Sequence, residues 1–201
     1  VLYMSLDWLI VGGGIHGVHL AARLLGEVGV DSDRLRIIDP GARLLSRWHA
    51  CTEVTGMTHL RSPSVHHLDL NPMSLQRFAG ARKSRKRGLF VPPFDRPALG
   101  LFNAHCERVI ETFGLSELHI QDRAEICRLG CAEVAVQLVS GRTITTRNLV
   151  LAIGSGEDPE WPEWAPRGDR RFRHVFEADF DAWPSPSETA AVVGGGISAA
   201  Q

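Results

Sequence analysis

The 201-residue sequence lacks several features that would assign it to a class of protein at once. Its 22 basic and 23 acidic residues nearly balance, so no global charge attracts nucleic acid or anionic lipid. No apolar run approaches the length of a membrane span, and the N-terminus lacks the basic and apolar regions of a signal peptide. We therefore expect a cytoplasmic protein with no nucleic-acid partner and no membrane partner.

Cysteine is also scarce. Cys51, Cys106, Cys127 and Cys131 are scattered, and a reducing compartment would leave all four as thiols. Cys127 and Cys131 are close in sequence, but no second pair of Cys or His follows at zinc-finger spacing. The sequence therefore predicts structural thiols and no metal site.

Glycine, by contrast, occurs in a defined pattern near the N-terminus. Gly12, Gly14 and Gly17 spell Gly-x-Gly-x-x-Gly, between a short apolar run at residues 8–11 and a helical apolar periodicity. The first glycine permits a tight turn, the second lets backbone amides approach a pyrophosphate, and the third lets the helix pack closely on the strand. The motif predicts a dinucleotide site at the positive end of a helix.

An acidic residue follows at the spacing that this motif requires. A second apolar run, at residues 35–38, ends at Asp39, which Pro40 follows. Asp39 stands where an acidic side chain accepts hydrogen bonds from the ribose hydroxyls of the adenosine. Strand, helix, strand and acid together form one βαβ unit.

The pattern returns near the C-terminus. An apolar run at residues 190–193 leads into Gly194, Gly196 and Ala199, which spell Gly-x-Gly-x-x-Ala. Two fingerprints in one chain indicate one site for FAD and one for the nicotinamide dinucleotide that reduces it. Alanine in the third position favours NADP and leaves NAD as the alternative.

The regular alternation of strands and helices lapses after Asp39. The region of about residues 43–94 carries aromatic, basic and imidazole groups, among them Arg47, Trp48, His49 and His59. Such groups suit a surface that lies against a flat heteroaromatic ligand, whose polar edge needs donors. In the alternative interpretation, Trp48 and the histidines only pack and cap the loop.

The remaining elements follow from local pattern. The basic run at residues 82–87 has no interleaved aromatic residues and is interpreted as a solvated loop. Asp95 is predicted to cap a helix that carries Pro97 in its first turn and ends at Gly114. Short strands are expected at residues 118–120, 125–129, 134–138 and 143–145, the last three as an antiparallel meander, and a buried strand at 148–154.

These elements predict an α/β fold with two parts. Residues 1–156 form a Rossmann-like FAD-binding domain, with a parallel sheet, helices and a β-meander, and with the flavin-facing region of about residues 43–94 inserted. Residues 157–201 form a proline-rich crossover and the truncated start of a second Rossmann-like, NAD(P)-binding domain. We expect a chain of this extent to lack a complete NADP site and to be a fragment without full turnover of its own.

With these motifs the sequence resembles the flavoproteins that have two dinucleotide-binding domains. Within them it is similar to the N-terminal half of class B flavin monooxygenases, particularly the lysine and ornithine N-hydroxylases of siderophore synthesis. The resemblance rests on both fingerprints, on Asp39, on residues 47–49 at the place of a Trp-His pair beside the flavin, and on residues 151–154. His174 and Trp183 depart from the spacing of the Baeyer–Villiger signature.

The resemblance and the motifs together give one set of cofactor-binding residues and no catalytic acid or base. The set is Gly12, Gly13, Gly14, Ile15, His16, Gly17, Asp39, Pro40, Arg47, Trp48, His49, His59, Ala152, Gly154, Gly194, Gly196, Ser198 and Ala199.

The resemblance also implies a chemistry. Reduced FAD reacts with molecular oxygen to give a C4a-hydroperoxide, which hydroxylates the nitrogen of a small amine or amino acid, while NADP is held beside it. Two alternatives stay open. One is a flavin- and nucleotide-binding module without its own turnover. The other is a flavoprotein of the disulfide reductase type, which needs Cys-x-x-Cys or Cys-x-x-x-x-Cys, and neither spacing occurs.

Overall fold

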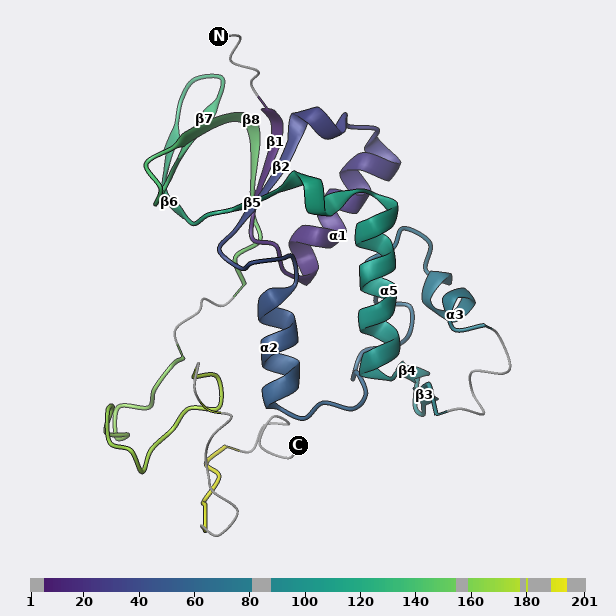
Figure 1. Ribbon diagram of the computed structural model, residues 1–201, viewed down its shortest axis with the longest axis vertical. Helices are drawn as coiled ribbons and strands as arrows, with labels where there is room; N and C mark the ends of the chain where they lie inside the picture. Colours follow the sequence, from purple (N-terminus) through teal and green to yellow (C-terminus); the bar gives the residue numbers. More distant parts are fainter. Residues whose placement is uncertain (1–5, 81–87, 155–158, 178–179, 181–188, 195–201) are drawn as a thin grey trace. The chain divides into compact units, whose positions relative to one another are not determined.

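The computed structural model describes residues 6–80, 88–154, 159–177, 180 and 189–194 (Figure 1). The chain divides into two compact units. The first comprises Val1–Trp48 and Thr58–Gly154, and the second comprises His49–Met57 and Ser155–Gln201. Each unit is described by itself below.

A six-stranded sheet forms the centre of the first unit, with the strand order β5-β2-β1-β8-β7-β6. The strands β5, β2, β1 and β8 run parallel to one another, whereas β8, β7 and β6 form an antiparallel meander. This arrangement confirms the predicted α/β class with a Rossmann-like sheet and a meander. The strands are β1 (Leu6–Val11), β2 (Leu35–Asp39), β5 (His119–Gln121), β6 (Ala124–Leu129), β7 (Val134–Leu138) and β8 (Thr143–Leu151).

Strand β8 links the two kinds of pairing. The sequence predicts two neighbouring strands here, but the structure has one strand of nine residues. Its first half pairs with β7, and from Thr146 onward it pairs with β1. Thr146 is fully buried at the change-over and donates its hydroxyl to the carbonyl oxygens of Leu6 and Asn148. The meander is therefore a direct extension of the parallel sheet.

Helices α1 and α5 of the first unit lie to one side of the sheet (Figure 1). Helix α1 packs against β1 and β2 through Val18, Ala21 and Ala22, all fully buried. It continues as a short π-helix that ends at Gly29, where φ is +77° and only glycine is free of strain. The helices are α1 (Ile15–Arg23), η1 (Leu24–Val28), η2 (Ser32–Arg34), α2 (Ser46–Val54), α3 (Ser74–Phe78), α5 (Leu99–Thr112) and η3 (Leu115–Leu118).

The start of α5 differs from the sequence prediction. Helix α5 begins at Leu99, after Ala98, and has no side-chain cap. Pro97 instead pairs with Phe90 in a small hairpin of β3 (Phe90–Val91) and β4 (Arg96–Pro97), and Asp95 lies in the turn of that hairpin. The predicted cap at Asp95 is therefore wrong, because local pairing with β3 takes the residues that would have formed the first turn. The predicted end at Gly114 is confirmed, with φ at +60°.

The described residues of the second unit carry little regular structure beyond the end of α2. Residues 159–177 form turns, held by the ion pairs Arg171–Asp169 and Arg173–Glu177. The apolar run at residues 190–193, which by analogy with the first fingerprint is expected to be a strand, forms no strand, and Val192 and Val193 are largely exposed. A strand needs a hydrogen-bonded neighbour, and no described strand pairs with this segment.

Some predictions fall outside the described residues. They are the loop at residues 82–87 and the fingerprint residues Gly196, Ser198 and Ala199. Across the described part of the chain, no helix is long and apolar enough to cross a membrane.

Candidate functional site

The first fingerprint forms the turn between β1 and α1, and two of its glycines are required by the fold. At Gly12, φ is +114°, and an added Cβ would clash with the carbonyl oxygen of Ala152. At Gly17, an added Cβ would clash with the carbonyl oxygen of Gly12. These contacts are the tight turn and the close helix packing that the motif predicts.

Gly14 differs from both, because an added Cβ there would meet no atom within 4 Å. Gly14 is the N-cap of α1, and no side chain caps this end of the helix. The first backbone N–H groups of a helix have no partner within the helix, and the helix dipole makes this end positive. The free space beside Gly14 is therefore a suitable place for an anion such as a pyrophosphate.

Asp39 closes the loop from the neighbouring strand. Its carboxylate accepts hydrogen bonds from the backbone N–H of Gly13 at 2.7 Å and of Gly41 at 2.8 Å. A carboxylate offers about four acceptor positions, so these two bonds leave room for the hydroxyls of a ribose. Asp39 thus organises the loop and keeps the acceptors that the prediction requires.

The site lies at the carboxyl edge of the sheet, where β1 has β2 on one side and β8 on the other. Gly12 donates its N–H to Ile38 O, and Ala152 donates its N–H to Val11 O, both at 2.8 Å. This is the reversal point of strand order at which open α/β sheets bind nucleotides. The structure therefore brings together residues 12–17, Asp39 and Ala152; Pro40, next to Asp39, and Gly154, two residues after Ala152, are exposed.

Leu45 is a residue of this region that sequence reasoning missed. Its backbone N–H donates to Gly13 O at 2.8 Å, and its side chain is 1% exposed. Its φ is +64°, which is unfavourable for a leucine. No local signal indicates this conformation, since Gly, Asn and Asp are the residues that favour it. The bond ties the start of α2, at Ser46, to the nucleotide loop.

Trp48 is fixed by helix α5. Its indole N–H donates to Asn103 Oδ1 at 2.9 Å, and its ring lies 5.4 Å from that of Phe102. Trp48 remains half-buried, so part of its surface is still available. Its neighbour Arg47 is exposed, and His49 belongs to the second unit. Asn103 was not predicted from the sequence, because nothing local relates it to Trp48.

His59 lies further along the inserted region. Its Nε2 is 3.1 Å from Gly88 O, and its backbone forms a bridge with Ala98, just before α5. These are the contacts of a residue that caps a loop, which is the alternative interpretation of this region.

The thiols show no arrangement for redox exchange. All four cysteines are free, and Cys106 is buried on α5, where burial raises the pKa of its thiol to about 12. Cys51 is half-buried, and Cys127 and Cys131 are exposed on the meander. Within the described ranges, no group of three or more His, Cys, Asp or Glu side chains could hold a metal ion.

The sheet, the glycine turn and the acid at the end of β2 define a dinucleotide-binding domain. The FAD-NAD(P)-binding family matches residues 9–156, and the chain belongs to this family. FAD and NAD(P) are accordingly its cofactors, and the space at Gly14 and the acceptors of Asp39 fit the pyrophosphate and the ribose.

Several solved structures have a similar fold at low sequence identity. A flavin-containing monooxygenase from Stenotrophomonas maltophilia is 20% identical, with a TM-score of 0.50 over 74% of this chain and 38% of its own. Two structures of OTEMO in complex with FAD and NADP are 16% and 17% identical, with TM-scores of 0.55 and 0.52. The matched regions cover 84% and 79% of this chain, but only 28% and 27% of the OTEMO chains.

These similarities establish the fold. The chain spans about a quarter to two fifths of the length of these structures. No curated protein matches the sequence.

Proposed function

We propose that this chain is the FAD-binding part of a flavin-dependent monooxygenase that uses NADPH and molecular oxygen to hydroxylate the nitrogen of a small amine or amino acid. The observation that carries the FAD site is the open space beside Gly14 at the N-terminus of α1, with Asp39 at the end of the next strand. N-hydroxylation is supported by a second observation: residues 47–49 resemble the Trp-His pair of the lysine and ornithine hydroxylases. Ala199 favours NADP over NAD.

The chain's own residues have distinct roles in this proposal. The first N–H groups of α1 hold the pyrophosphate, and Asp39 accepts from the ribose hydroxyls. Trp48, held by Asn103, would contact the flavin and help to exclude water from it. Arg47 is proposed to polarise the edge of the flavin pocket, whereas the contacts of His59 with Gly88 and Ala98 favour a loop-capping role. Bound FAD supplies the oxygen chemistry once it is reduced, so no side chain is assigned as a general acid or base.

The disulfide reductase alternative has less support. Such enzymes need two thiols that reach each other beside the flavin. The sequence offers neither spacing of the redox pair, and the one thiol of the inserted region, Cys51, has no second cysteine near it in sequence.

The first experiment is the visible absorption spectrum of the purified chain after FAD is added and the excess removed. We expect retained flavin absorption, and in Trp48→Ala we expect weaker binding and a shifted flavin spectrum. A folded but colourless protein would contradict the FAD site. A Trp48→Ala variant with unchanged affinity and spectrum would contradict the position given to Trp48.

A second experiment separates the chemistry from cofactor binding. The FAD-loaded chain is photoreduced, mixed with oxygen and L-lysine or L-ornithine, and assayed for a hydroxylamine. One oxygen atom is expected in the product and the other in water. Formation of hydrogen peroxide alone would contradict N-hydroxylation.

A further inference from the structure

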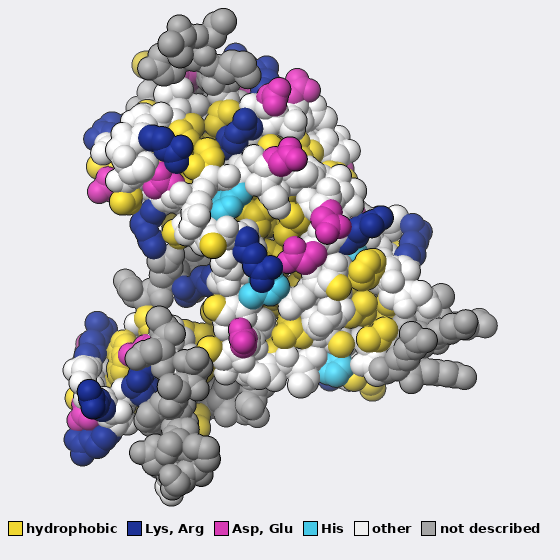
Figure 2. Space-filling model, in the orientation of Figure 1, with side chains coloured by type: hydrophobic (Ala, Val, Ile, Leu, Met, Phe, Trp, Pro, Cys, Tyr) yellow, Lys and Arg dark blue, Asp and Glu magenta, His cyan; other side chains and the backbone are white. Residues whose placement is uncertain are grey.

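A cavity of about 330 Å³ lies between α3 and α5, and its lining shares no residue with the glycine loop, Asp39 or residues 152–154. Asp69, Arg77 and Phe78 contribute to it from the segment around α3, and Arg108, Val109 and Phe113 from α5 and its end. Figure 2 shows hydrophobic, basic and acidic side chains close together on the face of the molecule that it presents. The volume is at the lower end of the range for small-molecule sites.

Two guanidinium groups of this lining are uncommitted. Among the residues that the structure describes, the side chains of Arg77 and Arg108 form neither an ion pair nor a hydrogen bond. Both residues are exposed at the rim. A guanidinium carries five donors in a planar fork that matches a carboxylate, so two of them beside one cavity favour an anionic ligand.

Asp69, the one acidic residue of the lining, does not neutralise them. Its carboxylate accepts the hydroxyl of Ser74 in a short hydrogen bond and the N–H of Leu70 at 2.7 Å. Hydrogen bonding lowers the pKa of Asp69, so it carries its charge at neutral pH. Two arginines and one aspartate give this lining a net charge of +1 when His105 is neutral.

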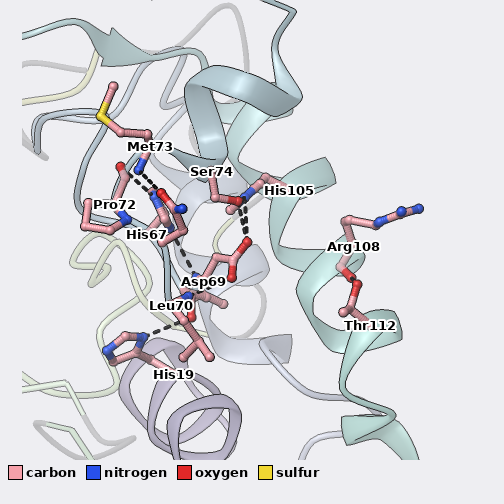
Figure 3. A network of polar contacts seen from close by, with 12 residues as sticks. His19, His67, Asp69, Leu70, Pro72, Met73, Ser74, His105, Arg108 and Thr112 are labelled. Carbon is pink, nitrogen blue, oxygen red and sulfur yellow. Dashed lines mark hydrogen bonds and ion pairs between the residues drawn. The ribbon is translucent and has the colours of Figure 1, made fainter. Parts of the chain in front are cut away.

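His105 is neutral for a structural reason. Because the Ser74 hydroxyl proton is donated to Asp69, Nε2 of His105 must carry the proton of the 2.7 Å contact with Ser74 Oγ (Figure 3). Its Nδ1 is buried and without a partner, so a second proton there would place an unpaired charge in the interior. Burial lowers the pKa of His105 to about 4, and the ring of His67, 4.9 Å away, adds to this.

The other walls are apolar. Phe78 is 45% exposed although it is a large aromatic residue, Val109 is buried, and Phe113 is half-buried. Such walls lower the free energy of a ligand that buries apolar surface against them. We propose that this cavity binds a small organic monoanion, a carboxylate with an aromatic or aliphatic body, whose charged group contacts Arg77 and Arg108 and whose body lies on Phe78, Val109 and Phe113.

Calorimetric titration of the full chain with phenylacetate tests the class of ligand. We expect saturable binding with a Kd of a few millimolar or tighter, and at least tenfold weaker binding of neutral phenylacetamide. Inorganic phosphate is expected to bind at least tenfold more weakly than phenylacetate, because it has no apolar body. Equal binding of phosphate or of the amide, or no binding of phenylacetate, would overturn the proposal.

Variants locate the binding. Arg77→Gln and Arg108→Gln are each expected to weaken phenylacetate binding, and the double variant to weaken it at least tenfold. Arg170→Gln, which removes the same charge from an exposed arginine of the second unit, is the matched control and is expected to bind as the parent does. Unchanged affinity in the double variant, or displacement of phenylacetate by ADP at the nucleotide loop, would overturn the assignment.

Discussion

A methyl group added at Gly17 would clash with the backbone of Gly12, whereas one added at Gly14 would meet no atom within 4 Å. We therefore expect Gly17→Ala to destabilise the fold by about 1–3 kcal/mol, the usual range of overpacked sites. Gly14→Ala is expected to change stability by less than about 1 kcal/mol, since Gly14 has a φ of −78° that alanine adopts easily. Its methyl group would nevertheless occupy the space of the pyrophosphate and weaken FAD binding at least tenfold.

Urea unfolding without FAD and a titration with FAD measure the two effects separately. If Gly14→Ala bound FAD like the parent, the open space beside Gly14 would not be the phosphate site. If it lost stability as Gly17→Ala does, the space would have a role in packing.

Asp39 is the second residue at which folding and binding can be separated. In Asp39→Asn, the one amide oxygen can accept a hydrogen bond from the N–H of Gly13 or of Gly41, but not from both. The amide nitrogen takes the place of the second oxygen and cannot accept. We expect a loss of about 1 kcal/mol of stability for the lost loop bond, together with a roughly tenfold loss of FAD affinity from the missing ribose acceptor. Asp33→Asn, an exposed residue of η2, is the matched control and should change neither quantity. An unaltered FAD affinity in Asp39→Asn would contradict the role of Asp39.

At the scale of elements, the packing of α3 against α5 is expected to be most stable when His105 is neutral. The pKa of His105 is about 4 in the folded protein and 6.5 in a free side chain, because burial disfavours its charged form. The unfolded chain therefore binds a proton between these values that the folded protein does not bind. The contribution of His105 to the free energy of unfolding is fully present above about pH 6.5. It falls as the pH drops to about 4, by about 1.4 kcal/mol per pH unit and by roughly 3 kcal/mol in all.

Urea unfolding at a series of pH values checks this dependence. His105→Gln keeps an N–H donor for Ser74 and has no titratable group, so we expect it to flatten the slope. Part of the pH dependence of stability should remain in this variant, because burial also lowers the pKa of His67. The same slope in His105→Gln as in the parent would assign the acid sensitivity to other groups.

The elements also show where sequence reasoning reaches its limit. The glycine turn, Asp39 and the meander were predictable, because each follows from residues close together in the sequence or from a fixed spacing. The cap at Asp95 was predicted wrongly, because the pairing of Pro97 with Phe90 overrides a local capping signal. Contacts of Leu45 with Gly13 and of Trp48 with Asn103 join distant residues by tertiary packing, and no local pattern encodes them.

At the scale of the whole molecule, the six-stranded sheet is complete at Leu151. The first unit ends at Gly154, close to the end of the family match at residue 156. The loop, Asp39 and Ala152 all lie before this point, and their hydrogen bonds are made within the first unit. We therefore expect a chain of residues 1–154 to fold cooperatively and to bind FAD within about threefold of the 201-residue chain, a difference of about 0.7 kcal/mol at most.

Thermal unfolding and FAD titration of the two chains, side by side, measure this. The thermal midpoint of residues 1–154 should agree with that of the 201-residue chain within a few degrees. In a domain of this size, a change of about 1 kcal/mol in the free energy of unfolding shifts the midpoint by about 2–4 °C. Gly14→Ala made in residues 1–154 should lose FAD binding as it does in the longer chain. A shorter chain that folds with the parent's stability but binds no FAD would mean that residues 155–201 complete the flavin site, and that the division into an FAD-binding part and a nicotinamide-binding part does not hold for binding.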